Sequence, residues 1–224
     1  MGYRAAIFDL DGTLIDSTWV WEVMIKKFCD VLNLKDMSDY MNSTAHMGPT
    51  EFINFVKKEH NLTQEVGEIK DILLRSAKEL YSTKVPLKKG ALRLLNLMTD
   101  NSIKLSIATS CFVELTEIVL KRWDVYDKFS FFAYSEQLGT NKKSADVYLK
   151  AANKMGVSFS ECAVFEDILF PLKAVKAQNM GFFAVEDKKR SEDIKKELKA
   201  NADFYIKDFD EFIDNGHFEE FFIS

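Results

Sequence analysis

Residues 5–14 read Ala-Ala-Ile-Phe-Asp-Leu-Asp-Gly-Thr-Leu, and this stretch decides the expected fold. Four apolar residues predict a buried strand, and Asp9 and Asp11 follow at its end. Alternate residues of a strand share a face, so both carboxylates can point toward one place. Buried carboxylates are costly unless they are compensated, and a divalent cation compensates them well. The alternative is a strand that ends in a solvated acidic turn, with Gly12 at the turn.

The composition is that of an ordinary globular protein. The 224 residues are 47% hydrophobic and 29% charged, and the net charge is −5, so one large domain or a domain with an insertion is expected. The acidic balance argues against a nucleic-acid partner. No run of apolar residues is long enough to cross a membrane, and no signal-peptide pattern opens the chain. We therefore expect a cytoplasmic protein without a membrane partner, and a monomer or weak dimer.

Two further features of the composition are expected to be structural. The basic runs Lys188-Lys189-Arg190 and Lys195-Lys196 are predicted to be solvated loop and helix faces. Cys29, Cys111 and Cys162 are odd in number and far apart, which does not fit a disulfide framework or a zinc site. We expect each to be a small buried hydrophobe.

The segment after the first strand is predicted to be wholly helical. Apolar spacing indicates helices over residues 18–34, from Pro49 onward, and from Val66 to about Leu80. No convincing strand lies between residues 16 and 83. This predicts an inserted helical domain at residues 17–84, and a core domain made of residues 1–16 and 85–224.

The rest of the chain alternates between helices and strands, which predicts an α/β fold with a mostly parallel sheet covered on both faces. The expected strands are 104–109, 129–134, 162–165, 182–185 and 203–206, and the expected helices are 91–100, 113–122, 145–155 and 171–179, one after residue 191, and one at the C-terminus. Ser144 and Ser191 are expected to be N-caps. Gly181 is expected to close the helix before it.

Polar residues follow three of the predicted strands. Besides the first acidic pair, Thr109-Ser110 and Glu166-Asp167 stand at strand ends, and Lys142 precedes a helix. In open α/β sheets, ligands bind beyond the carboxyl ends of the strands. Carboxylates can hold Mg²⁺, while hydroxyls, helix N-termini and a lysine suit a phosphate. Such a set indicates phosphoryl transfer.

In this order, these four elements resemble the motifs of the haloacid dehalogenase superfamily. The resemblance covers nearly the whole chain, and it is greatest to the β-phosphoglucomutase-like and phosphatase subgroup, whose helical cap is inserted just after the first motif. It implies a Rossmann-like three-layer core with an inserted four-helix cap, Mg²⁺ as the cofactor, and a small phosphorylated metabolite as the substrate.

The resemblance also implies roles for single residues. Asp9 would be the nucleophile that forms an aspartyl-phosphate, and Asp11 would be the general acid and then the base. Asp9, Asp11, Asp167 and Glu166 would hold the metal. Thr109, Ser110 and Lys142 would bind the phosphate.

The chain departs from the family pattern at three places. The run Lys142-Lys143-Ser144-Ala145-Asp146 lacks both family prolines, so the sequence leaves open whether Lys142 or Lys143 serves the phosphate. The Ser and Gly that usually follow the second acidic pair are replaced by an apolar loop at 168–171. Trp21 and Glu51 stand where a mutase has a histidine and a phosphate-gripping arginine.

These departures favour one function among three. The first is a Mg²⁺-dependent phosphatase acting through an aspartyl-phosphate, the second a sugar-phosphate mutase, and the third a degenerate, non-catalytic protein that binds a phosphorylated ligand or a partner protein. A carboxylate at position 51 cannot clamp a second phosphate, which places the phosphatase first. Specificity is expected from the cap, with the candidates His46, Met47, Trp19, Trp21 and Lys57.

Overall fold

The computed structural model describes residues 2–34 and 41–223, and its core is a six-stranded sheet. The strands are β1 (Ala5–Phe8), β2 (Lys104–Thr109), β3 (Phe131–Tyr134), β4 (Cys162–Glu166), β5 (Gly181–Val185) and β6 (Phe204–Ile206). All neighbours pair in parallel, in the order β3-β2-β1-β4-β5-β6. This order confirms the predicted Rossmann-like core.

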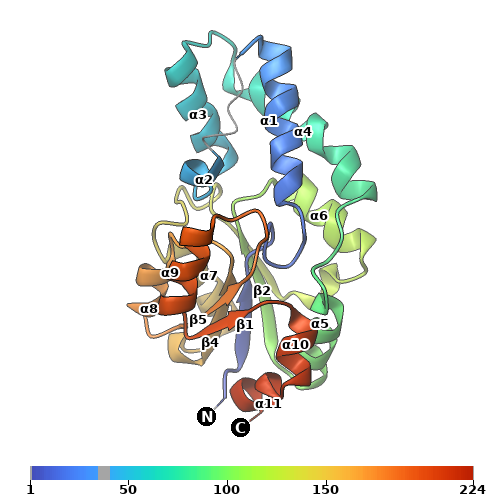
Figure 1. The fold of residues 1–224 in the computed structure, drawn as a ribbon, viewed down its shortest axis with the longest axis vertical. Coiled ribbons are helices and arrows are strands. Elements are labelled where there is room, and N and C mark those ends of the chain that lie inside the picture. Colours follow the sequence, from blue (N-terminus) through green and yellow to red (C-terminus); the bar gives the residue numbers. More distant parts are fainter. Residues whose placement is uncertain (1, 35–40, 224) are drawn as a thin grey trace.

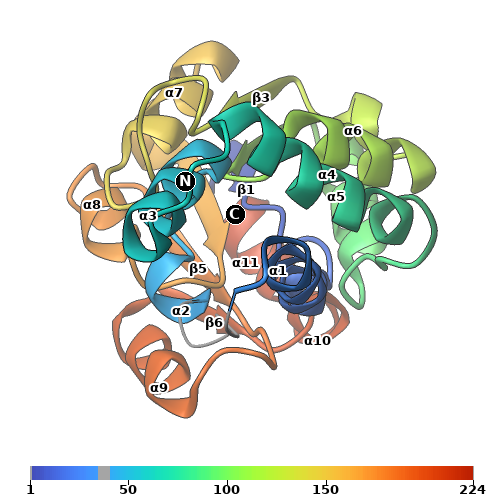
Figure 2. The same cartoon turned by 90° about the horizontal axis from the view of Figure 1, so that it is seen from above.

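Helices cover both faces of the sheet because its strands are apolar on both faces. Ala5 and Ile7 of β1 face α7 (Asp146–Met155), α8 (Leu172–Lys176) and α9 (Glu192–Asn201). Ala6 and Phe8 belong to the other face, which is covered by α5 (Ala91–Asp100), α6 (Val113–Arg122), α10 (Phe209–Asp214) and α11 (His217–Phe222). Figure 2 shows these two sets of helices on opposite sides of the strands. The result is a three-layer arrangement.

Stacked phenylalanines join the central strands to the C-terminal helices. The rings of Phe8 and Phe165 stack at a centroid distance of 4.4 Å, and Phe165 stacks on Phe183 at 5.1 Å. Phe221 of α11 meets Phe183 edge-on at 5.0 Å. Burial of a phenylalanine side chain contributes roughly 1.5–3 kcal/mol, and aromatic pairs add about 0.5–1.5 kcal/mol. These contacts hold the strands whose ends carry the acidic residues.

Among the described residues, four helices lie between β1 and α5, and the apolar spacing of the sequence predicts three of them. They are α1 (Thr18–Leu32), α2 (Met41–Thr44), α3 (Pro49–His60) and α4 (Val66–Thr83); the one-turn α2 was not predicted, and residues 35–40 lie outside the described part. Figure 1 shows these helices above the sheet. Helix α4 packs against α1, α3 and the core helix α6. We call α1–α4 and their connections, residues 17–84, the helical insertion.

The chain leaves the core and returns to it at one place. The Asp16 N–H donates to the Pro86 carbonyl at 3.0 Å, and the Lys88 N–H donates to the Leu14 carbonyl at 2.9 Å. Ile15 and Leu87 form an antiparallel bridge between these two segments. The two core segments that flank the helical insertion are therefore hydrogen-bonded to each other.

Two predicted helix ends were wrong. Helix α8 ends at Lys176, and the turn after it is made by Asn179 with a φ of 59°. Gly181 instead begins β5, where a Cβ would lie 2.3 Å from the hydroxyl oxygen of Tyr3. Glycine is thus needed there for close packing, not for closing a helix. The C-terminal helix is two helices, because Gly216 with a φ of 77° breaks it.

The two predicted N-caps have different outcomes. Ser191 caps α9, since its side chain accepts a hydrogen bond from the Ile194 N–H. Ser144 is not the N-cap of α7, which is Ala145. The Ser144 hydroxyl is engaged by its neighbours instead, donating to Asp146 at 2.8 Å and lying 3.0 Å from the Thr140 hydroxyl.

The structure bears on two features of the composition. The three cysteines are free and buried, as predicted. Within residues 2–34 and 41–223, no helix combines the length and the apolar character that a membrane span requires.

Two leucines of α5 test how burial stabilises the core. Leu94 is fully buried, whereas Leu92 is 42% exposed. We expect Leu94→Ala to lower the free energy of unfolding by about 2–5 kcal/mol, because it leaves a cavity in the core. Leu92→Ala should change it by no more than about 0.5 kcal/mol. Urea denaturation of both variants measures the difference; equal losses would contradict this view of the core.

Candidate active site at the strand ends

Parallel pairing brings the polar strand ends together. Phe8 pairs with Phe165 of β4 and with Ile107 of β2, so the next residues, Asp9 and Glu166, lie side by side. Asp9 is 4% exposed and Glu166 is fully buried. The predicted convergence of acidic residues at one edge of the sheet is therefore present in the structure.

Lys142 lies between two of these carboxylates. Its ammonium group donates to Asp9 Oδ1 and, at 2.5 Å, to Glu166 Oε1. Lys142 is 2% exposed, so this pairing is inside the protein. The side chain of Lys143 lies against the Phe170 ring instead, with its Nζ 5.9 Å from the ring centre. Of the two lysines that the sequence left open, Lys142 is the one at the strand ends.

Burial and neighbouring charges have opposite effects on the pKa values of Lys142 and Asp9. Burial alone would lower the pKa of Lys142, but the charges of Asp9 and Glu166 outweigh it and raise that pKa. Lys142 is therefore a permanent cation. Burial raises the pKa of Asp9 well above its ordinary value, and the Lys142 charge offsets only part of this. A further cation beside Asp9 would favour its ionised form.

Glu166 is fully hydrogen-bonded. Its Oε1 accepts from Lys142 and, at 2.6 Å, from the Tyr148 hydroxyl, whose pKa is raised by burial and by the Glu166 charge. Its Oε2 accepts from the N–H groups of Asp167 at 3.0 Å and Ile168 at 3.3 Å. A carboxylate offers about four acceptor positions, and all are used here. Glu166 therefore fixes Lys142 and the start of the next loop.

Asp167 is held by two donors that the sequence did not indicate. The Thr13 hydroxyl donates to Oδ1 at 3.1 Å, and Arg190 Nε donates to Oδ2 at 2.7 Å. The prediction that the run 188–190 is solvated is correct for Lys188 but wrong for Arg190, whose side chain is only 10% exposed. The available signal was its position, since Arg190 follows the carboxyl end of β5 at the same edge of the sheet.

Asp187 in the same loop was also missed. It is 2% exposed, and it accepts from the Thr18 hydroxyl and from the Lys189 N–H at 2.8 Å. Thr18 is the first residue of α1, so Asp187 connects the core to the helical insertion. A Cβ on Gly12, whose φ is 84°, would lie 2.6 Å from the Oδ2 atoms of both Asp167 and Asp187. Only glycine fits at position 12.

The acidic cluster has the chemistry of a divalent-cation site. Carboxylate oxygens of Asp9, Glu166 and Asp167 all lie within 4.8 Å of one another and are buried. Oxygen ligands of this kind suit Mg²⁺. The donor set therefore fits the predicted cation, and Asp9 and Asp167 have fewer competing hydrogen bonds than Glu166.

Thr109 and Ser110 lie where the sequence places them, at the end of β2. Thr109 is 1% exposed, and its hydroxyl accepts from the Cys111 N–H at 3.0 Å. The Ser110 hydroxyl lies 2.9 Å from the Ser135 hydroxyl. Helix α6 begins three residues after Ser110, and no side chain caps its first turn. Its positive end is thus near both hydroxyls.

Asp11 accepts hydrogen bonds from two residues of the helical insertion. Its Oδ1 accepts from the Ser17 hydroxyl at 2.6 Å and from the Tyr81 hydroxyl of α4. Burial, followed by the charge of Asp11, raises the pKa of Tyr81, so this hydroxyl keeps its proton. Neither partner was expected from the sequence, and Tyr81 has the helical spacing of a core residue.

One cavity of about 100 Å³ collects these groups. The predicted site residues that line it are Asp9, Asp11, Thr109, Ser110, Lys142 and Asp167, and Glu166 lies behind them. Of the predicted specificity residues, Trp21 and Met47 line the cavity, but His46, Trp19 and Lys57 do not. His46 is buried against the Phe170 ring, with the ring centres 4.6 Å apart.

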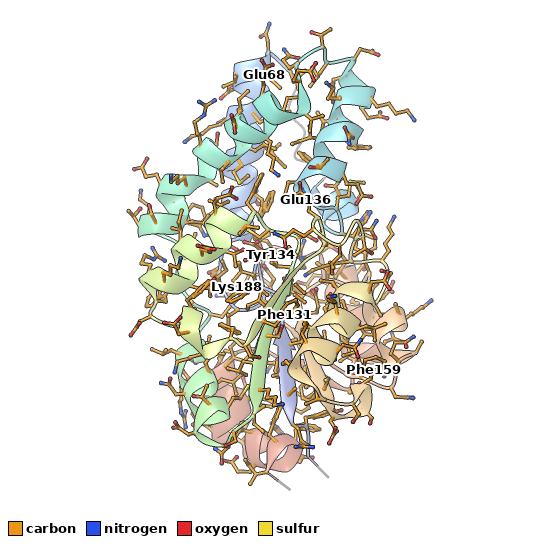
Figure 3. All side chains as sticks on the ribbon, turned by 180° about the vertical axis from the view of Figure 1, so that it is seen from behind. Glu68, Phe131, Tyr134, Glu136, Phe159 and Lys188 are labelled. Atoms are coloured by element: carbon orange, nitrogen blue, oxygen red, sulfur yellow. The ribbon has the colours of Figure 1, made fainter. Side chains whose placement is uncertain are left out.

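Polar contacts attach the helical insertion over this cavity. Glu136, which follows β3, accepts from Thr50 of α3 at 2.6 Å and from Lys70 of α4 at 2.9 Å. Figure 3 shows Glu136 at the junction between the sheet and the helices. Asn141 donates to Glu51 at 3.2 Å. The single connection between β3 and α7 is thus hydrogen-bonded to both α3 and α4.

The geometry agrees with comparisons to known proteins. Over 181 residues the chain is 27% identical to hexitol phosphatase B of Escherichia coli K12, covering 79% of this chain and 80% of that protein. It is 28% identical over 189 residues to β-phosphoglucomutase of Bacillus subtilis strain 168, covering 81% and 82%.

A solved structure and a family model extend these likenesses. The crystal structure of CbbY from Rhodobacter sphaeroides in complex with phosphate superposes with a TM-score of 0.81 at 19% identity, covering 94% of this chain and 96% of that one. The family model described as haloacid dehalogenase-like hydrolase matches residues 6–185. The chain therefore belongs to the haloacid dehalogenase-like hydrolase family.

Proposed function

We propose that the chain is a Mg²⁺-dependent phosphatase of small phosphorylated metabolites that works through a phosphorylated Asp9. The observation that carries this proposal is the shared cavity, in which a buried acid–lysine pair faces two hydroxyls and a helix N-terminus. Relatives named hexitol phosphatase and phosphorylated carbohydrates phosphatase support phosphatase activity on small phosphorylated molecules. In this proposal residues 17–84 act as a cap on a core of residues 1–16 and 85–224.

The acidic residues would hold Mg²⁺. Asp9 and Asp167 would be direct carboxylate ligands, Asp11 would offer its main-chain carbonyl, and Glu166 would bind only by exchanging one of its present hydrogen bonds. When bound, the cation neutralises negative charge on the phosphoryl oxygens. Arg190 and Thr13 would keep Asp167 oriented, in place of the Ser and Gly that the family usually has after this position.

The protein's own groups can perform both chemical steps. A carboxylate oxygen of Asp9 attacks phosphorus, the bond to the ester oxygen breaks, and Asp11 donates a proton to that oxygen. Asp11 then accepts a proton from water, which attacks phosphorus and releases phosphate and free Asp9. Lys142, Thr109 and Ser110 donate to the phosphoryl oxygens, and the first turn of α6 adds its positive end.

The structure favours hydrolysis over mutase activity. A mutase must hold a second phosphate, and Glu51 occupies the place of the family's gripping arginine and is bonded to Asn141. The described residues that the helical insertion contributes to the cavity include no lysine, arginine or histidine. A non-catalytic protein is also disfavoured, because each chemical position keeps a suitable side chain. Incubation with β-glucose 1-phosphate separates the first two functions, since a phosphatase releases phosphate and a mutase makes glucose 6-phosphate.

Asp9→Asn tests the nucleophile. We expect phosphate release from p-nitrophenyl phosphate to fall by at least about a thousandfold, because an amide oxygen is a poor nucleophile. Circular dichroism and thermal unfolding should show a folded variant, and chelation of Mg²⁺ in the wild type should give a similar loss. A wild-type rate in Asp9→Asn would exclude the aspartyl-phosphate.

Lys142→Gln and Lys143→Gln form a matched pair. Lys142 is buried between two carboxylates, whereas Lys143 is exposed. We expect Lys142→Gln to lower kcat/KM about a hundredfold or more, since it removes a preorganised charge beside the phosphoryl group. Because Lys143 is exposed, Lys143→Gln removes no such charge, and its kcat/KM should stay within about threefold of the wild-type value. Equal losses in steady-state kinetics would remove Lys142 from the proposed site.

Arg190→Met tests whether this arginine supports the metal ligand. Loss of one partner of a buried ion pair leaves an uncompensated charge, so we expect the free energy of unfolding in metal-free buffer to fall by about 3–5 kcal/mol. Lys188→Met, in the same loop but exposed, is the control and should change it by no more than about 0.5 kcal/mol. Urea denaturation measures both, and a small loss in Arg190→Met would show that Asp167 does not depend on it.

A further inference from the structure

The cavity surface contributed by the helical insertion is mostly apolar. The side chains that line it from this part of the chain include Trp21, Ile25, Met47, Pro49 and Phe52. Ile25 and Phe52 are buried, and Trp21 and Met47 are half-buried. In the proposed reaction the phosphate lies against the strand ends, so the leaving group faces this surface.

Few polar groups are present on that surface to bind hydroxyls. Among the described residues, the polar side-chain groups that the helical insertion adds to the lining are the hydroxyls of Thr18 and Thr44 and the indole N–H of Trp21. The Thr18 hydroxyl already donates to Asp187. A buried hydroxyl without a partner costs roughly 1–3 kcal/mol, so a leaving group with several hydroxyls is disfavoured here.

The charges of the described lining are also paired within the protein. Lys142 is bonded to Asp9 and Glu166, and Arg190 is bonded to Asp167. These are the two cations among the described residues that line the cavity. A second anionic group on the substrate would face apolar side chains, which favours a substrate with a single phosphate.

The cavity is small as well. Its volume of about 100 Å³ is below the roughly 300–1,000 Å³ of common small-molecule sites. The phosphoryl group takes part of this space. A larger neighbouring cavity of about 500 Å³ lies beyond Ala45, Ile168 and Arg190, which line both. The leaving group must therefore be short to remain within the first cavity.

From this lining we infer that the enzyme prefers phosphomonoesters with one phosphate and a short, largely apolar alcohol as the leaving group. The inference rests on the proposed phosphatase function and narrows its substrate class. It distinguishes this chain from an enzyme for hexose or hexitol phosphates, whose leaving groups carry many hydroxyls.

Propyl phosphate and glycerol 3-phosphate test the polarity of the leaving group, because they share a three-carbon skeleton and differ by two hydroxyls. With Mg²⁺ and the full chain, we expect kcat/KM for phosphate release to be at least about tenfold higher for propyl phosphate. From methyl to propyl phosphate, each methylene should raise kcat/KM about fourfold. Hexyl phosphate and glucose 6-phosphate should be poor substrates, because they exceed the cavity.

The outcomes separate this inference from the proposed function. If glycerol 3-phosphate or glucose 6-phosphate is hydrolysed as well as propyl phosphate, or hexyl phosphate is the best substrate, the inference is wrong and the phosphatase function stands. If none of these esters, nor the more reactive acetyl phosphate, releases phosphate with Mg²⁺, the proposed function itself fails.

Met47→Gln provides a second test at nearly constant side-chain volume. We expect it to lower kcat/KM for propyl phosphate about fivefold and to leave the value for glycerol 3-phosphate unchanged or higher, because an amide replaces an apolar contact. Lys58→Gln on the exposed face of α3 is the control and should leave the ratio unchanged. If Met47→Gln lowers both substrates equally while folded, Met47 does not contact the leaving group, which contradicts the inference.

Discussion

The structure depends on compensation of buried negative charge at the ends of parallel strands. Asp9, Glu166, Asp167 and Asp187 all lie in the interior at one edge of the sheet. Lys142, Arg190 and Lys88 supply three positive charges against these four carboxylates, with Lys88 Nζ 4.0 Å from Asp187 Oδ2, and a divalent cation would add further compensation. Such a cluster is stable only because each carboxylate has defined partners. In the proposed function, phosphoryl transfer would use this same cluster of buried charges.

This compensation is possible because of the strand order. β1 lies between β2 and β4 in the sheet. The loops that follow these three strands therefore meet at the same edge of the sheet, although they are far apart in the sequence. Lys142 reaches Asp9 over 133 residues of sequence, and Arg190 reaches Asp167 from the loop after β5. The apolar strands and the stacked phenylalanines fix the distances between these side chains, since they leave the strands no room to shift.

The parts of the site that sequence could reveal are those with a local signal. Asp9, Asp11, Thr109 and Glu166-Asp167 each follow a readable apolar strand, and the helices of the insertion have clear periodicity. Tyr81 carries no such signal, and although Asp187 and Arg190 follow a predicted strand, their importance comes from partners far away in the chain. The misplaced helix ends have the same origin. Gly181 looked like a helix terminator, but its neighbour in space is Tyr3.

The paired segments at residues 14–16 and 86–88 have a consequence for how this architecture can diversify. The segment that leaves the core and the segment that returns to it are hydrogen-bonded to each other. The distance between them is therefore set within the core, and not by residues 17–84. Helices of another length or composition could replace residues 17–84 without moving the strand ends. In the proposed function, the catalytic chemistry and the choice of leaving group would thus be encoded in separate stretches of the chain, and each could change while the other is preserved.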